Sequence, residues 1–248
     1  MKIMIIDGGP RKDMNTAAMV QAFAEGAQEG GAEVKVVRLY DIDYKGCRSC
    51  MACQLKDRRV ASCRFPDGLT DILKECSEAD GLVLASPIYY GEMTGMMRSF
   101  WERLTFPWLD YSQGIFMSPR KMAVTFIYTM NGMPNNGEKI RRSSMRTVET
   151  MTGLALYHSL SHKVEVLMAN NTMQVKDYDR YHFAAGTAEA KQQWRDAHWE
   201  EDLRKARESG KRMASADKRR YQEIFSTISR ISAALLNHSF FFVFSLPD

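Results

Sequence analysis

The sequence of 248 residues lacks the long apolar runs that membrane proteins need. It contains no stretch of about 18 uninterrupted apolar residues, which argues against a membrane-spanning helix. The apolar segment at residues 1–7 is short and runs at once into glycines, unlike the apolar region of a secretory signal peptide. We therefore expect a soluble, cytoplasmic protein without a membrane span.

Charge of one sign is also scarce. The 34 lysines and arginines are nearly balanced by 30 acidic residues, which leaves a formal net charge of +4. Nucleic-acid-binding proteins concentrate basic residues on one face, and this composition shows no such excess, so we expect no nucleic-acid partner. Small molecules that carry phosphate remain candidate partners.

Two common nucleotide-binding motifs are missing as well. No Gly-Lys-Ser/Thr follows the first glycines at the spacing that nucleoside triphosphatases use, and the three-glycine dinucleotide pattern is absent. The five cysteines do not spread along the chain as a disulfide framework would, because four of them lie between residues 47 and 63. This distribution predicts a reducing compartment, with metal or redox chemistry at the cluster.

Short apolar runs alternate with helical patterns through most of the chain. The crossovers between the runs are too long for hairpins, which indicates parallel strands covered by helices on both faces. The sequence therefore predicts an α/β domain with a five-stranded parallel sheet. The expected strands are 2–7, 33–39, 81–86, 121–128 and 163–168, and the expected helices are 16–28, 69–76, 95–106 and 138–152.

The end of the chain departs from this alternation. Residues 188–220 are dense in charge and predict a solvated helix, and residues 221–236 carry an apolar stripe at helical spacing. The aromatic run at 240–244 is short for a membrane span, which favours a subunit contact or packing on the core over a membrane anchor. We expect one domain at 1–215 and a helical, apolar tail at 216–248.

The loop after the first strand has the composition of an anion site. Crevices beyond the carboxyl ends of parallel strands collect the free amides of helix amino termini. Gly8 and Gly9 let the backbone approach a ligand closely, and Arg11, Asn15 and Thr16 supply donors beside the helix start. An ordinary glycine turn with a helix cap remains the alternative.

The loop after the third strand suits a flat ligand. It runs from Ser86 to Gly95 and contains Tyr89 and Tyr90 next to Gly91. Tyrosine rings can lie against an aromatic ligand, while glycine lets main-chain donors reach its edge. The residues alone equally fit tyrosines at the rim of a core.

Together, the two loops resemble a known family. The segment Asp7-Gly8-Gly9-Pro10-Arg11-Lys12-x-x-Asn15-Thr16 resembles the phosphate loop of the NADPH-dependent FMN reductase and iron-sulfur flavoprotein branch of the flavodoxin-like superfamily. Ser-Pro-x-Tyr-x-Gly-x-Met-x-Gly at residues 86–95 resembles the flavin ring loop of the same family. Gly9 stands where the family usually has serine. The resemblance covers about residues 1–215.

The resemblance implies a flavodoxin-like three-layer sandwich with strand order 2-1-3-4-5 and bound FMN. It implies transfer of electrons from NADPH or NADH to a small acceptor such as a quinone, flavin, metal ion or nitroaromatic, with no side chain as catalyst. The alternative is an electron carrier that acts with a protein partner. A homodimer or homotetramer is expected. The implied FMN-binding residues are Gly9, Arg11, Asn15, Thr16, Pro87, Ile88, Tyr89, Tyr90, Gly91, Glu92, Thr129, Asn131 and Gly132.

The last three of these belong to a loop after the fourth strand, which by resemblance contacts the pyrimidine end of the flavin. Asn-Gly also occurs in many loops for conformational reasons alone, so this signal is weak by itself. The segment 171–181 also resembles a stretch of some flavodoxin-like oxidoreductases, without an assigned chemistry.

The cysteine cluster has the spacing of an iron-sulfur site. Cys47-x2-Cys50-x2-Cys53 lets adjacent thiolates reach corners of one cube, and Cys63 is the nearest fourth ligand. Iron-sulfur flavoproteins carry a compact motif of this kind after the second strand. Three interpretations stay open for these residues: a [4Fe-4S] cluster, free redox-active thiols, or zinc.

Overall fold

The computed structural model describes residues 1–56, 61–111, 114–116, 118–157, 164–182 and 187–215. The expected tail at 216–248, with its apolar stripe and aromatic run, lies outside the described residues.

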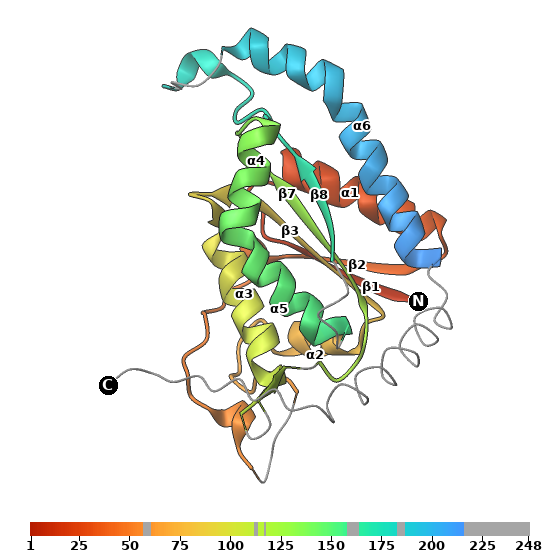
Figure 1. Cartoon of the computed structure of the whole chain (residues 1–248), viewed down its shortest axis with the longest axis vertical. Coiled ribbons are helices and arrows are strands. Elements are labelled where there is room, and N and C mark those ends of the chain that lie inside the picture. The colour runs from red at the N-terminus through yellow and green to blue at the C-terminus, as the bar shows by residue number, and fades with distance from the viewer. Residues whose placement is uncertain (57–60, 112–113, 117, 158–163, 183–186, 216–248) are drawn as a thin grey trace, which may run out of the picture. The chain divides into compact units, whose positions relative to one another are not determined.

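A parallel sheet in the order β2-β1-β3-β7-β8 runs through the middle of the domain (Figure 1). The order confirms the flavodoxin-like arrangement expected from the resemblance, since these five strands are the predicted five in chain order. Their bounds are β1 Lys2–Asp7, β2 Glu33–Arg38, β3 Gly81–Tyr89, β7 Ala123–Thr129 and β8 Glu165–Ala169.

The three central strands are buried because their sequences are apolar on both faces. Ile3 to Ile6 of β1 have no exposed surface, and β7 is buried throughout. A strand covered on both sides needs such a continuous apolar run rather than alternation. Asp7 pairs with Ala85 and Pro87 with Thr129, so the carboxyl ends of β1, β3 and β7 meet at one edge of the sheet.

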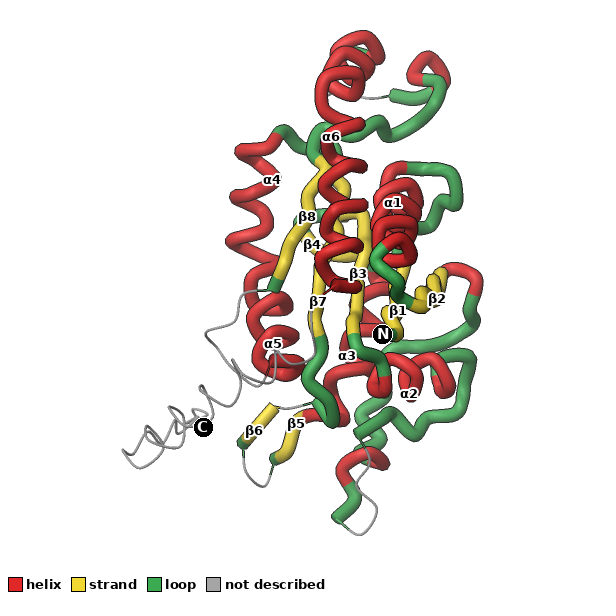
Figure 2. The backbone as a smooth tube through the Cα atoms, turned by 90° about the vertical axis from the view of Figure 1, so that its right-hand side faces the viewer, coloured by secondary structure: helices red, strands yellow, loops and turns green. Residues whose placement is uncertain are grey.

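Helices cover both faces of the sheet (Figure 2). Helices α1 and α6 lie on one face, and α3 and α5 lie on the other, with α2 packed against α3. The helices are α1 Asn15–Glu29, α2 Thr70–Glu78, α3 Gly95–Thr105, α4 Pro134–Ile140, α5 Arg146–Tyr157 and α6 Ala188–Ser215. Short 3-10 turns occupy Leu39–Asp41, Ala52–Gln54, Phe106–Trp108 and Tyr178–Arg180.

The structure refines three of the sequence expectations. The single helix expected at 138–152 begins earlier, at Pro134, because proline fits the first turn of a helix. A π-helical turn at Arg141–Met145 divides it into α4 and α5. Two short strands, β5 Leu109–Asp110 and β6 Ile115–Phe116, pair antiparallel in a small separate sheet that the sequence did not indicate (Figure 2).

The sequence predicted that the charged helix α6 is solvated. The structure corrects this expectation, because one side of the helix is buried. One stripe of it is buried, and it packs on α1 so closely that backbone meets backbone. A Cβ atom added to Gly26 of α1 would lie 1.8 Å from the carbonyl oxygen of Arg207, and one added to Gly210 would lie 2.1 Å from that of Phe23. The buried stripe consists of Lys191, Trp199, Ala206, Ser209, Gly210 and Met213.

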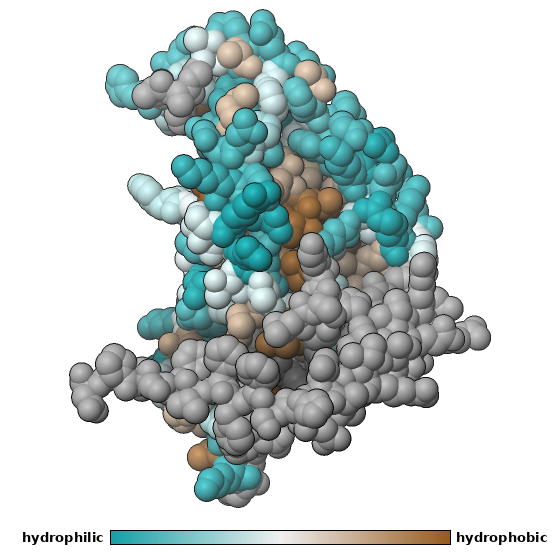
Figure 3. Space-filling view, viewed as in Figure 1, coloured by the Kyte–Doolittle hydropathy of each residue, from teal (hydrophilic) through white to brown (hydrophobic). Residues whose placement is uncertain are grey.

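Apolar atoms reach the surface over β8, the edge strand of the sheet (Figure 3). Val166, Leu167 and Met168 are only half-buried there. Within the described part of the chain, no helix combines the length and apolar character needed to cross a bilayer.

The glycine contact between α1 and α6 leads to a stability prediction. Gly26→Ala forces a methyl group into the backbone of α6, and overpacking of this kind costs about 1–3 kcal/mol even after partial relaxation. We expect a lower midpoint of urea unfolding. Gly95→Ala is the matched control because a Cβ atom there meets nothing within 4 Å. Equal stability of the two variants would contradict the packing described here.

Candidate functional site

The carboxyl ends of β1, β3 and β7 border one open pocket of about 430 Å³, counting space open to solvent. Four segments far apart in the sequence meet there. The lining residues are Gly9, Pro10, Arg11, Met14, Asn15, Thr16, Pro87, Ile88, Tyr89, Thr129, Met130, Asn131, Thr172 and Gln174. Most of the residues named from the sequence thus lie together, whereas Tyr90, Gly91, Glu92 and Gly132 are not part of the lining.

Helix α1 points its amino terminus at this pocket. Met14 precedes the helix, and its side chain does not cap the first amides of α1. Free amides at a helix start carry a partial positive charge and favour an anion. Arg11, Asn15 and Thr16 surround these amides, which makes this end of the pocket suitable for phosphate.

A buried carboxylate shapes the turn between β1 and α1. Asp7 Oδ1 accepts from the Gly9 amide at 2.8 Å, and Asp7 Oδ2 accepts from Arg38 Nη1 at 2.8 Å. Burial raises the pKa of Asp7 above its usual value, and the Gly9 amide and the Arg38 charge oppose that rise. A Cβ atom at position 9 would lie 2.9 Å from Asp7 Oδ1, so a side chain there would crowd this carboxylate.

The segment after β8 forms the wall behind the phosphate end. Asn15 Nδ2 donates to the Met173 carbonyl at 2.6 Å, and Arg11 donates to the Gln174 carbonyl. Thr172 and Gln174 from this segment line the pocket. The sequence analysis singled out residues 171–181 without assigning them chemistry. Their contribution depends on long-range contacts that the sequence pattern does not reveal.

Two buried threonines tie the first loop to the loop after β7. The hydroxyl oxygens of Thr16 and Thr129 lie 2.7 Å apart and share a hydrogen bond. Thr94 Oγ1 donates to the Gly8 carbonyl at 2.9 Å, which joins the loop after β3 to the same turn. Side-chain hydrogen bonds therefore hold all three loops in one arrangement.

The loop after β3 is a β-hairpin rather than the simple strand-to-helix turn that was expected. Strand β3 continues to Tyr89 and pairs back with β4, Glu92–Met93. Tyr90 and Gly91 form the turn with φ of 51° and 87°, the positive values that two-residue hairpin turns of type I′ require. Tyr89 consequently faces the pocket, whereas Tyr90 is fully exposed.

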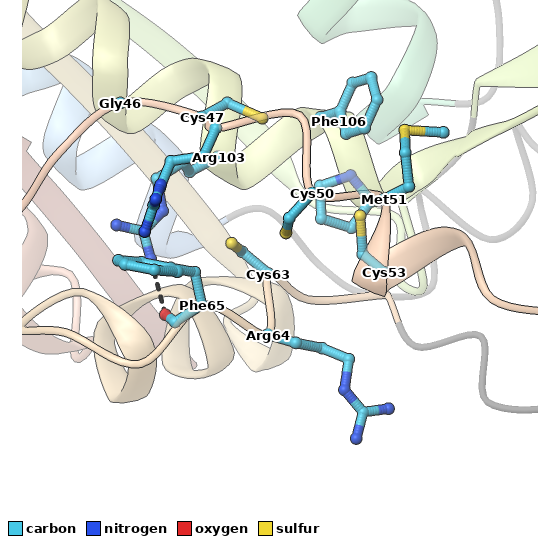
Figure 4. Close-up of a pocket in the computed structure, with 12 residues that line it drawn as sticks. Gly46, Cys47, Cys50, Met51, Cys53, Cys63, Arg64, Phe65, Arg103 and Phe106 are labelled. Atoms are coloured by element: carbon cyan, nitrogen blue, oxygen red, sulfur yellow. Dashed lines mark hydrogen bonds between the residues drawn. The ribbon is translucent and has the colours of Figure 1, made fainter.

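The four clustered cysteines line a second pocket of about 370 Å³ (Figure 4). Cys47 and Cys50 are exposed, Cys63 is half-buried and Cys53 is buried, and all are free thiols. Burial raises the pKa of Cys53, and the neighbouring thiols of Cys63, Cys47 and Cys50 raise it further.

The cysteine side chains do not fit the [4Fe-4S] cluster or the zinc site considered from the sequence. Among the described residues, no group of three or more cysteine, histidine or acidic side chains converges as metal ligands must. The Cys-x2-Cys-x2-Cys spacing brings the four residues to one pocket, but in the described part of the chain it does not bring three of their thiols into one ligand group.

Arg103 of α3 holds both ends of this cysteine segment. Its buried guanidinium donates to the Lys45 carbonyl at 3.1 Å before the cysteines and to the Phe65 carbonyl at 3.0 Å after them, and it pairs with Asp67. The planar guanidinium of arginine has five N–H donors, so it can bind three acceptors at once.

Removing this guanidinium tests the clamp. Arg103→Leu leaves the Asp67 carboxylate without its partner, and breaking a buried pair typically costs about 3–5 kcal/mol. We expect lower stability and faster alkylation of the buried Cys53 thiol. Arg98→Leu on the exposed face of the same helix is the control. Unchanged Cys53 alkylation in a destabilised Arg103→Leu protein would argue against the clamp.

Comparisons with known proteins agree with this geometry. Residues 1–141, more than half of the chain, match the family model described as NADPH-dependent FMN reductase. An iron-sulfur flavoprotein of Archaeoglobus fulgidus is 32% identical over 103 residues, which are 42% of this chain and 48% of that protein. The chain thus spans about half the length of the iron-sulfur flavoproteins it matches.

Two further matches extend over most of the chain. An NAD(P)H dehydrogenase (quinone) of Archaeoglobus fulgidus is 24% identical over 205 residues, covering 81% of this chain and 90% of that protein. The solved structure of an NAD(P)H:quinone oxidoreductase from Methanothermobacter marburgensis has a TM-score of 0.60 at 18% identity and covers 85% of this chain and 98% of that one. Because it is only 18% identical, this solved structure shows that the two proteins share a fold. The chain belongs to the NADPH-dependent FMN reductase family.

Proposed function

We propose that this chain binds FMN in the pocket at the carboxyl ends of β1, β3 and β7 and acts as an oxidoreductase. Electrons would come from NADPH or NADH and pass to a small acceptor. The observation that carries the proposal is the meeting of three loops around one pocket with an anion-binding end and an aromatic end. A cytoplasmic location belongs to the same proposal.

The residues present fit the phosphate of FMN. The amides at the start of α1 have no side-chain cap, and Arg11 brings a positive charge to the same end of the pocket. The Thr16 hydroxyl adds a donor at the first turn of the helix. Helix amides, a guanidinium and a hydroxyl are the usual donors for a phosphate monoester.

The opposite end of the pocket fits a flat ring. Tyr89 supplies an aromatic face and is 42% exposed, so the ring end is open to a second molecule. Pro87 and Ile88 line the pocket with backbone that can reach the ring edge. Bound FMN supplies the hydride and electron chemistry that no side chain has, while the protein orients it and tunes its potential.

The names of two relatives support a quinone as the first acceptor to test. One is called an NAD(P)H dehydrogenase (quinone) and the other an NAD(P)H:quinone oxidoreductase. A flavin, metal ion or nitroaromatic compound remains a further candidate because the open ring end has no shape specific to quinones.

An electron carrier that acts with a protein partner is the second candidate. The gathering of four cysteines in one pocket and the names of the iron-sulfur flavoproteins favour it. The cysteine geometry does not fit a cluster, so no electron transfer through iron and sulfide is part of this candidate. Such a carrier needs no nicotinamide pocket.

Anaerobic stopped-flow mixing with NADPH or NADH tests the proposal and separates the two candidates. For an oxidoreductase, protein reconstituted with FMN loses its flavin absorbance rapidly. Flavin that binds but keeps its colour with both nicotinamides favours the carrier. Protein that takes up no FMN rejects both.

The phosphate end gives a sharper prediction. Arg11→Met removes a charged donor, and a hydrogen bond to a charged group is worth about 1.5–3 kcal/mol. The Kd for FMN should therefore rise by about tenfold to a hundredfold. The Kd for riboflavin, which has no phosphate, should stay unchanged.

The neighbouring Lys12→Met is the matched control, because Lys12 pairs with Asp41 and does not line the pocket. Fluorescence titration with FMN and riboflavin measures both constants. If Arg11→Met raised the Kd for FMN and the Kd for riboflavin by the same factor, the phosphate would not lie at the start of α1.

A further inference from the structure

A lysine from α6 is buried directly behind the flavin pocket. Lys191 is 4% exposed, and its Nζ donates to the carbonyl oxygen of Asn131 at 3.1 Å. The same Nζ donates to the side-chain oxygens of Asn131 and Asn171. Lys191 lies outside residues 1–141, the part of the chain that matches the family model.

The hydrogen-bond partners of this lysine carry no negative charge. Within the described residues, Lys191 forms no ion pair, and each of its three Nζ partners is a neutral amide oxygen. Burial lowers the pKa of Lys191. Burying a cation without a counter-ion destabilises the folded protein. A lysine kept in such a place beside the pocket therefore indicates a contribution to the function of that pocket.

The lysine fixes the direction of the Asn131 amide. An ammonium group only donates, so both oxygens of Asn131 must face Lys191. The NH2 group of this side chain therefore turns away from the lysine and is available as a donor. Because Asn131 lines the pocket, it can present donors there.

Asn131 lies at the ring end of the pocket. Thr129 pairs with Pro87 in the sheet, so the loop that follows β7 emerges beside the segment Pro87–Tyr89. The loop is held in place from behind, since the Asn171 amide donates to the Gly132 carbonyl at 2.8 Å and that of Thr172 to the Met130 carbonyl at 3.0 Å.

We propose that Lys191 is a positioning residue that raises the reduction potential of bound FMN, by aiming the Asn131 donors at the ring edge and by placing a positive charge behind it. The inference rests on the proposed function. Flavin gains electron density at the pyrimidine edge on reduction, and fixed donors and charges aimed at that edge favour the reduced form. An unneutralised charge acts over several ångströms in a protein interior.

Spectroelectrochemical titration of the FMN-loaded protein tests this directly. Lys191→Gln keeps a donor but removes the charge, and we expect the equilibrium between reduced and oxidised flavin to shift at least about tenfold toward the oxidised form. For a two-electron couple this is about 30 mV lower in midpoint potential. Lys191→Arg retains the charge and should stay within about threefold of the wild type.

Lys205→Gln is the matched control on the same helix, because this exposed lysine pairs with Glu201 away from the pocket. Its potential should equal that of the wild type. A Lys191→Gln potential that also equals the wild type would overturn the inference while leaving FMN binding intact. If Lys191→Gln and Lys191→Arg lowered the midpoint potential of the flavin equally, the positive charge of Lys191 would not be the cause.

A second variant keeps the test decisive if Lys191→Gln does not fold. Asn171→Asp gives Lys191 an ion-pair partner of the same shape, and aspartate tolerates the φ of 50° found there. We expect a stable protein whose potential is lowered by a similar amount. A wild-type potential in Asn171→Asp would contradict the inference. Wild-type protein that takes up no FMN would instead reject the proposed function.

Discussion

Parallel pairing of β1 with β3 and of β3 with β7 is the constraint on which the rest of the structure depends. It brings three strand ends to one edge, where the loops that follow can meet around one ligand. The Thr16–Thr129 and Thr94–Gly8 hydrogen bonds then fix the loops to one another. The candidate site is thus a consequence of sheet topology, and no single motif contains it.

The helix α6 completes the site from a distant part of the sequence. Its glycine contact with α1 lets the two backbones touch, and the same helix carries Lys191 to the back of the Asn131 loop. Residues 1–141 contain the loops, but the wall formed by Thr172 and Gln174 and the buried lysine come from beyond them. The family match and the later part of the chain therefore contribute different parts of one pocket.

Local patterns predicted the strands well, because buried parallel strands leave strong signals in a single segment. The three pocket loops were named from the family resemblance, because the residues of each loop alone also fit an ordinary turn or a core rim. The outward direction of Tyr90 was missed, since it depends on pairing between β3 and β4 rather than on the turn itself. Lys191 was missed because a lysine in a charged helix looks solvated until its packing partners are known. Cysteine spacing left a cluster, free thiols and zinc open for Cys47 to Cys63, because spacing does not fix where the side chains meet in the fold. The structure has them as free thiols around one pocket.

Hydrogen-deuterium exchange with and without FMN tests the central claim most directly, because it reports on every segment at once. The account predicts that FMN slows exchange in residues 8–16, 86–89 and 129–131 together, with no change in the cysteine segment at 46–56. Protection confined to the cysteine segment, or to only one of the three loops, would contradict it.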